Sequence, residues 1–253
     1  MRWYQESAVH AALLEMLADK HRALLSLATG TGKTFIAFNL CWKLIKSRYA
    51  KKVLFLADRV NLRDQAYNEF GAFGNARAVA GNGQVPLDYD LHFGIYQGLY
   101  APHPHGGRLY ERYPRDYFDL IVIDECHRSG YGDWRAILDY FDSAFHLGMT
   151  ATPKRTDSID TYEFFASENR DGDGQPQPVF EYSLGRGIDD GYLATYLVRQ
   201  IVTNLDQEGL QVEDEVERGA DLLVPEDVVV REIYLSPQVR KGDRCPRSDQ
   251  DAL

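Results

Sequence analysis

Short apolar runs alternate with longer segments of helical spacing over the first 153 residues of the chain. The apolar runs predict strands at 23–27, 52–57, 92–95, 120–123 and 145–149. Longer segments, with apolar residues three or four positions apart, predict helices at 7–20, 33–47, 61–70 and 134–141. Buried strands that alternate with crossover helices are typical of a parallel sheet covered on both faces. The pattern therefore predicts an α/β fold, a parallel β-sheet flanked by helices.

The pattern changes after Pro153. Residues 169–178 are rich in Gly, Pro, Asn and Asp and indicate a loop or linker. One more strand is expected at 196–203 and a strand or helix at 228–235, and the last eighteen residues lack apolar periodicity. We therefore expect three parts: a sheet domain at 1–168, a linker and the start of further structure at 169–205, and a poorly ordered, incomplete extension at 206–253.

The formal net charge of −10 at first argues against a nucleic-acid partner, because phosphate binding needs Lys and Arg. Most of that charge is local: residues 204–232 hold ten acidic side chains against only Arg218 and Arg231. The rest of the chain sums to about −2, so basic faces remain open. The acidic stretch indicates a solvated, loosely ordered segment, with a nucleic-acid mimic as the alternative.

The chain has 253 residues, 44% of them hydrophobic, which is enough for a substantial core. No stretch approaches the roughly 18 consecutive apolar residues of a membrane span, and the first residues lack the layout of a secretory signal. Cys41, Cys126 and Cys245 are far apart and odd in number, which fits reduced thiols. We expect a cytoplasmic protein with no membrane partner.

A phosphate-binding loop is predicted where the strand at 23–27 runs through 28–34 into a helix. Gly30 and Gly32 let backbone N–H groups converge on anionic oxygens. Thr29 precedes the first glycine, and Thr31 lies between the two. Lys33 offers an ammonium to the β and γ phosphates, and the Thr34 hydroxyl can ligate Mg²⁺. Leu27 stands where the strict motif has Gly, and the alternative is a Gly-rich turn before a helix. The loop therefore predicts that the chain binds a nucleotide together with Mg²⁺.

The strand at 120–123 ends in an acidic pair, Asp124 and Glu125, followed by Cys126 and His127. Parallel strands deliver their carboxyl ends to the edge where ligands bind. Asp124 there can hold Mg²⁺ through water, and Glu125 can orient and deprotonate an attacking water. The alternatives are a helix N-cap for the pair, a local hydrogen bond for His127 and an inert buried thiol for Cys126. Zinc is not indicated, because no partner pair stands at ligand spacing.

Two further groups of polar residues flank these motifs. The next strand ends in Thr150 and Thr152, whose hydroxyls could couple the γ-phosphate to a neighbouring surface. Arg2 and Gln5 precede the first helix, and a Gln amide can read an adenine edge bidentately. For a terminal Arg and Gln the alternative is simple surface exposure.

Together Gln5, the loop at 28–34, the acidic pair and the string at 149–153 resemble the first motor domain of a superfamily 2 helicase or translocase. The sequence of these motifs is similar to one family in particular, the R (restriction and translocation) subunit of type I restriction enzymes. The strings that carry this resemblance stand at 2–5, 55–59, 123–128, 150–155, 159–165, 182–184 and 187–193. The resemblance covers roughly residues 1–205, and it implies that a second motor region starts within 169–205.

The resemblance implies a RecA-like P-loop NTPase domain, the ATP-binding and ATP-hydrolysing half of a translocase on double-stranded DNA. It also implies methyltransferase and specificity subunits as partners. By the family pattern Arg59, Gln65, Tyr96 and Gln97 face the DNA, and chemically they suit phosphate and sugar contacts that carry no sequence information. The alternatives are a helix-start charge for the first pair and an aromatic packed at a strand end for the second.

Two departures from the family lead to the expectation of a truncated or split motor. The chain has no Gly-Arg-x-x-Arg string of a second motor domain, whose arginines speed phosphoryl transfer by about 10³ or more in related enzymes. The family's N-terminal nuclease region is also expected to be absent, because the resemblance to the motor begins immediately after Met1. We expect weak ATP hydrolysis by this chain alone. The alternatives are another superfamily 2 enzyme acting on DNA or RNA, a non-catalytic module that docks on a motor, and a remnant without a role.

Overall fold

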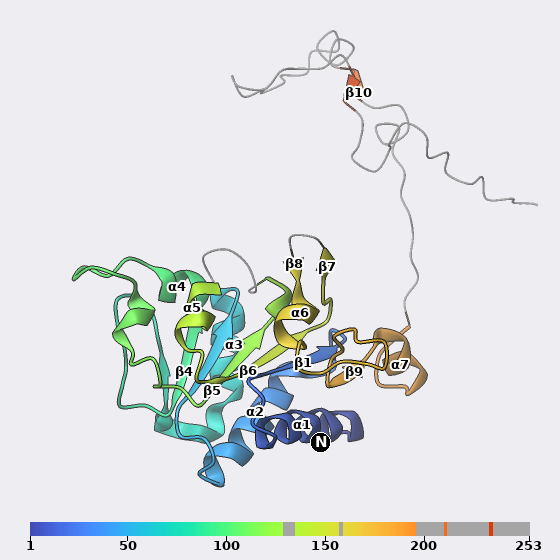
Figure 1. Ribbon diagram of the computed structural model, residues 1–253, viewed down its shortest axis with the longest axis horizontal. Coiled ribbons are helices and arrows are strands. Elements are labelled where there is room, and N and C mark those ends of the chain that lie inside the picture. Colours follow the sequence, from blue (N-terminus) through green and yellow to red (C-terminus); the bar gives the residue numbers. More distant parts are fainter. Residues whose placement is uncertain (129–134, 157–158, 196–209, 212–232, 235–253) are drawn as a thin grey trace, which may run out of the picture. The chain divides into compact units, whose positions relative to one another are not determined.

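The computed structural model describes residues 1–128, 135–156 and 159–195, together with 210–211 and 233–234 (Figure 1). It divides into two units, Met1–Thr195 and Tyr196–Leu253. In the second unit β10 (Leu210–Gln211) pairs antiparallel with β11 (Ile233–Tyr234). The strand expected at 196–203 lies outside the described residues, and β11 falls within the element expected at 228–235.

The first unit is built on a seven-stranded, all-parallel sheet, so the predicted fold class is confirmed. The strands lie in the order β3-β4-β2-β5-β6-β1-β9. Their bounds are β1 (Arg22–Leu27), β2 (Val53–Ala57), β3 (Arg77–Val79), β4 (Leu91–Ile95), β5 (Leu120–Asp124), β6 (Phe145–Thr150) and β9 (Phe180–Tyr182). A small antiparallel pair, β7 (Arg155–Thr156) and β8 (Ile159–Asp160), lies outside this sheet. Each of the five predicted strands is present within one residue at either end, whereas β3 and β9 are too short to show an apolar pattern.

Helices cover both faces of the sheet, because successive residues of each buried strand point to opposite sides. Leu25, Phe55 and Val122 pack with α1, α2 and α3 on one face, while Leu54 and Ile121 pack with α4, α5 and α6 on the other. The helices are α1 (Trp3–Leu17), α2 (Lys33–Lys46), α3 (Val60–Glu69), α4 (Tyr96–Tyr100), α5 (Arg135–Tyr140), α6 (Thr161–Phe165) and α7 (Leu184–Asp189). Short 3₁₀ turns are η1 (Gly71–Ala76), η2 (Leu109–Arg112) and η3 (Cys126–Arg128).

The first helix begins and ends earlier than the predicted range 7–20. It begins at Trp3 because the Gln5 side-chain oxygen accepts a hydrogen bond of 2.9 Å from the Arg2 backbone N–H. This contact satisfies one of the backbone donors left open at a helix start. The helix ends at Leu17, just before Asp19 enters the left-handed region with φ +54°.

The sheet extends past the boundary expected at residue 168. β9 pairs in parallel with β1, with Leu25 opposite Phe180 and Leu27 opposite Tyr182, and the chain up to Thr195 clusters with the sheet. The loop expected at 169–178 therefore connects two parts of the same unit. The start of a second motor region within 169–205 stays a prediction. In the part of the chain that the structure describes, no helix has the length and apolar character needed to cross a membrane.

His146 of β6 makes the stability of the sheet depend on pH. Its ring is 1% exposed, its Nε2 lies 2.9 Å from the carbonyl oxygen of Phe141, and its Nδ1 has no hydrogen-bond partner among the described residues. Burial lowers the pKa of His146 to about 4. Well above pH 6.5 the ring is neutral in both the folded and the unfolded chain, so it does not make the free energy of unfolding depend on pH. Between pH 6.5 and 4 only the unfolded chain binds the proton, so stability falls as the pH falls.

We predict that the wild-type chain loses about 3 kcal/mol more unfolding free energy than His146→Gln on going from pH 7 to pH 4. Gln keeps a donor for the Phe141 carbonyl and does not titrate, so buried His92, whose pKa is also lowered to about 4, affects both proteins equally. Urea denaturation at a series of pH values measures the difference. Parallel pH profiles for the two proteins would contradict the assignment.

Candidate functional site

The phosphate loop lies between the end of β1 and the start of α2, as the sequence predicts. Gly30 and Gly32 adopt left-handed φ values of +85° and +82°, which glycine tolerates and other residues rarely adopt. Gly32 caps α2, so Lys33 is the first helical residue and Thr34 the second, both half-buried. Buried Thr31 tightens the turn by donating a hydrogen bond of 2.6 Å from its hydroxyl to the Ala28 carbonyl, while Thr29 is exposed.

The start of α1 holds this loop from one side. Gln5 Nε2 and the Tyr4 hydroxyl both donate to the Thr31 carbonyl oxygen, at 2.9 Å and 3.0 Å. Sequence reasoning singled out Gln5 and missed Tyr4, which is fully buried. The sequence shows only an aromatic residue next to Gln5 at the start of a helix. Its role becomes visible once the fold places the phosphate loop beside it.

Both polar atoms of the Gln5 amide already have partners inside the protein, since its oxygen accepts from the Arg2 backbone. The amide keeps one further N–H and one further lone pair, so adenine recognition by Gln5 stays a prediction. A cavity of about 470 Å³ adjoins it. The lining residues are Met1, Arg2, Gln5, Gly30, Thr31, Gly32 and Phe35.

The acidic pair lies against the phosphate loop. Asp124 ends β5, and Glu125 turns away from the strand with a left-handed φ of +50°, unusual for a residue with a side chain. One Glu125 oxygen, Oε1, lies 3.5 Å from Lys33 Nζ, and the other, Oε2, lies 3.3 Å from His127 Nδ1. Residues 92 positions apart in sequence therefore form an ion pair at one edge of the sheet.

His127 connects this pair to the end of β6. Its Nδ1 lies 2.8 Å from the hydroxyl oxygen of Thr150, and the same oxygen accepts a hydrogen bond of 3.1 Å from the Thr152 backbone N–H. Thr150 is buried, whereas the Thr152 side chain is exposed. Four of the predicted residues, Lys33, Glu125, His127 and Thr150, are thus brought together in one row. Cys126 is fully buried in the hydrophobic core, and burial raises the pKa of its thiol.

Asp124 is the most buried carboxyl group of the site, with 8% of the residue exposed. Burial and the neighbouring Glu125 raise its pKa to about 6, against the opposing effect of Lys33. A carboxylate in this environment gains from a nearby cation, and carboxylate and hydroxyl oxygens are the ligands that Mg²⁺ prefers. The carboxylate of Asp124 and the hydroxyl of Thr34 therefore have the donor chemistry that Mg²⁺ requires.

Residues 1–155 match the ResIII family, described as type III restriction enzyme, res subunit. The chain belongs to this family. A type I restriction enzyme endonuclease subunit, EcoAI of Escherichia coli, is 41% identical over 212 residues, which are 82% of this chain and 25% of that relative. The resemblance to the R subunit of type I restriction enzymes is thereby confirmed. The chain spans about a quarter or less of the length of the curated relatives it matches first.

Solved structures show the same likeness. A fragment described as an HsdR subunit of a type I restriction enzyme from Vibrio vulnificus YJ016 is 41% identical, with a TM-score of 0.58 over 75% of this chain and 32% of that chain. The SWI2/SNF2 ATPase core of Sulfolobus solfataricus, solved in complex with dsDNA, has a TM-score of 0.53 at 18% identity, covering 65% of this chain and 35% of that one. At that identity the second likeness shows the fold alone.

Three of the four residues expected to face DNA are exposed in this ResIII domain. Arg59 precedes α3 and pairs with Asp58 at 3.5 Å, Gln65 donates to Glu69, and Gln97 lies near the start of α4. Tyr96 differs from the expectation: its side chain is 0% exposed and packs among the apolar residues under α4 and α5. A DNA contact by this ring would require it to leave the core, so the structure favours the packing alternative for Tyr96.

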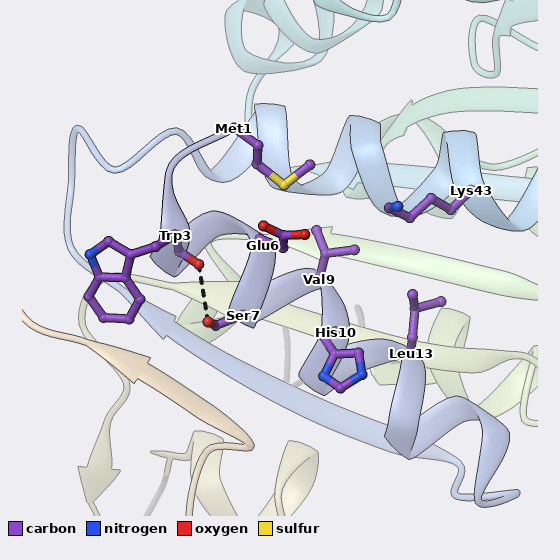
Figure 2. Close-up of a pocket in the computed structure, with 8 residues that line it drawn as sticks. All are labelled: Met1, Trp3, Glu6, Ser7, Val9, His10, Leu13 and Lys43. Atoms are coloured by element: carbon purple, nitrogen blue, oxygen red, sulfur yellow. Dashed lines mark hydrogen bonds between the residues drawn. The ribbon is translucent and has the colours of Figure 1, made fainter.

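A second hollow lies on the outer side of the ResIII domain, between α1 and α2, and contains no residue of the phosphate loop. Figure 2 shows Ser7 donating its hydroxyl to the Trp3 carbonyl at the rim, with the Trp3 indole lying apart from the other side chains (Figure 2). Lys43 comes from α2, and Glu6, Val9, His10 and Leu13 come from α1. Met1 lines both this hollow and the cavity beside Gln5.

We predict that Gly32→Ala abolishes measurable nucleotide binding by the ResIII domain. A Cβ at Gly32 would stand 2.9 Å from Gln5 Nε2, so the brace on Thr31 must shift, and φ of +82° strains any side chain. Gly106→Ala is a matched control, because Gly106 has φ +85° with nothing within 4 Å. Gly106→Ala should lose about 1 kcal/mol of stability in urea denaturation, and Gly32→Ala should lose more because of the contact with Gln5. Only Gly32→Ala should lose affinity for a fluorescent ATP analogue. Equal affinities would contradict the packing argument.

Proposed function

We propose that this chain is the ATP-binding and ATP-hydrolysing half of a DNA translocase motor, from the R subunit of a type I restriction system. The observation that carries the proposal is the ion pair between Lys33 of the phosphate loop and Glu125 of the acidic pair. It joins two motifs from different strands at the carboxyl edge of a parallel sheet, where nucleotides bind in α/β folds. Family membership and the identity to type I restriction subunits support the same proposal.

The residues of the site divide the work between binding and proton transfer. Backbone N–H groups of Thr29, Gly30, Thr31 and Gly32, with the Lys33 ammonium, would hold the phosphates, and Arg2 and Gln5 would meet the base. Thr34 and Asp124 would hold Mg²⁺, which supplies charge neutralisation at the phosphates when bound. Lys33 is paired with Glu125 here, so its engagement by phosphates would free Glu125 to orient a water molecule and accept its proton.

His127 and Thr150 would pass the state of this site to the neighbouring surface. His127 contacts both the Glu125 carboxylate and the Thr150 hydroxyl, so a movement of Glu125 changes the contacts at the end of β6. Thr152 is tied to the same hydroxyl through its backbone and exposes its side chain. We infer that these two threonines couple hydrolysis to DNA movement.

Double-stranded DNA is the proposed track. The Sulfolobus ATPase core that shares this fold was solved with dsDNA. In this chain Arg59 and Gln97 are exposed just after the ends of β2 and β4, and Gln65 is exposed on α3. Their chemistry suits backbone contacts, which position a motor without reading sequence. The methyltransferase and specificity subunits of a restriction complex are the proposed protein partners.

The proposed motor needs residues beyond those described here. The curated relatives that match first are about four to five times as long as the stretch they share with this chain. The family resemblance assigns the transition-state arginines to a second motor domain. Without such arginines phosphoryl transfer is slower by a factor of about 10³ or more. The chain alone should therefore bind nucleotide and turn it over slowly.

ATP hydrolysis by the purified chain, with and without double-stranded DNA or RNA, tests this function. We expect Mg²⁺-dependent nucleotide binding with turnover near background. Lys33→Ala should weaken binding by about tenfold or more, whereas Glu125→Gln should keep binding and lose the residual turnover.

Two outcomes would change the conclusion. Strong DNA-stimulated turnover that disappears in Lys33→Ala would show that a complete site assembles within this chain and would overturn the half-motor proposal. Stimulation of residual turnover by RNA and not by DNA would assign the motor to RNA instead.

A further inference from the structure

The strings at 182–184 and 187–193, which resemble the type I family, have no role in the site described so far. They form the end of β9, the helix α7 and the turn that follows it. β9 is the edge strand next to β1, with Leu27 opposite Tyr182, and the Ala28 N–H donates to the Tyr182 carbonyl at 3.0 Å. This segment therefore lies beside the strand residue from which the phosphate loop departs.

The Tyr182 ring is fully buried and stacked on Tyr4. The two ring centroids are 4.1 Å apart with an interplanar angle of 8°, and Trp3 packs edge-on against Tyr182 at 5.7 Å. At the far end of the same ring, the Tyr182 hydroxyl donates to an Asp190 carboxylate oxygen at 2.6 Å. The position of Tyr4, and with it the hydroxyl that donates to the Thr31 carbonyl, is thus fixed by Tyr182.

The turn after α7 reaches the phosphate loop a second time. Gly187 is buried, and its carbonyl accepts hydrogen bonds from the N–H groups of Tyr192 and Leu193 at 2.9 Å and 2.8 Å. This folds Leu193 back toward the loop, where a Cβ placed on Gly30 would stand 3.3 Å from Leu193 Cδ2. The Arg2 guanidinium lies over the Tyr192 ring, 4.8 Å from its centroid.

We propose that residues 180–193 support the phosphate loop, and that Tyr182 is a positioning residue that acts on this loop through Tyr4. The proposal rests on the nucleotide binding proposed above. Tyr182 touches no nucleotide itself; it holds the Tyr4 ring, the Tyr4 hydroxyl holds the Thr31 carbonyl, and that carbonyl fixes the orientation of the neighbouring N–H groups. Leu193 closes the same loop at Gly30.

This support by residues 180–193 explains why the sheet domain continues beyond residue 168. Without β9 and α7 the stacked face of Tyr4 and the outer side of Gly30 would lose their contacts. Because a coupling between two sites is reciprocal, nucleotide bound at the loop should in turn stabilise residues 180–193.

The test compares four variants by ATP-analogue affinity and by amide hydrogen exchange. Tyr4→Phe keeps the stack and removes the donor to Thr31, Tyr182→Leu removes the stack, Tyr182→Phe keeps it, and Glu181→Ala changes an exposed neighbour on the same strand. We expect Tyr4→Phe and Tyr182→Leu to weaken binding about 3- to 10-fold and to speed exchange in residues 28–34 without nucleotide. Tyr182→Phe and Glu181→Ala should stay within about twofold of wild type. In the wild type the analogue should slow exchange in 180–193.

The outcomes separate this inference from the proposed function. If Tyr182→Leu lowers the unfolding temperature but leaves affinity and loop exchange at wild-type values, Tyr182 is merely structural and the positioning role is overturned. If Tyr182→Leu does not fold, Tyr4→Phe decides, since it retains the ring. If the wild type binds no nucleotide, the proposed function is wrong. If the exchange of residues 28–34 is also unchanged in Tyr4→Phe, the positioning of the loop by the Tyr4 hydroxyl is overturned as well.

Discussion

The parallel pairing of β5, β6 and β1 is the constraint on which the site depends. In this register Ser26 lies opposite Thr150, and Asp124 lies opposite Met149, so three strands end at one edge within a residue or two of each other. A parallel sheet sends every carboxyl end to the same side. The phosphate loop, the acidic pair and Thr150 meet there although they are far apart in sequence. The antiparallel alternative would have sent at least one of them to the opposite edge.

A single backbone carbonyl, that of Thr31, organises the loop once the strands have placed it. It accepts hydrogen bonds from Tyr4 and Gln5, which belong to the start of α1, while the Thr31 hydroxyl bonds back to Ala28. These contacts hold Gly30 and Gly32 in place, in left-handed backbone conformations that glycine adopts without steric cost. Preorganisation of this kind reduces the entropic cost of binding.

Much of this arrangement follows from local sequence, and the rest depends on contacts that local sequence does not encode. Five strands of the sheet carry enough apolar residues to be recognised. The residue types and spacing of the Lys33 and Asp124 motifs predict phosphate and metal binding. The three-residue strands β3 and β9 cannot show periodicity, and they form because long neighbours offer them hydrogen bonds. Tyr96 illustrates the converse limit. Its place at a strand end fits a DNA contact equally well, and only the packing around it shows that the ring is buried.

On the proposed function, the phosphate loop and the buried Asp124 form one site for a nucleotide with magnesium. Isothermal titration of ATP into the wild type and into Asp124→Asn, each with and without Mg²⁺, tests it most directly. We expect Mg²⁺ to strengthen ATP binding to the wild type by about tenfold or more, and we expect Asp124→Asn to bind ATP without this gain. Binding of equal strength with and without Mg²⁺ in both proteins, or no binding to the wild type, would contradict it.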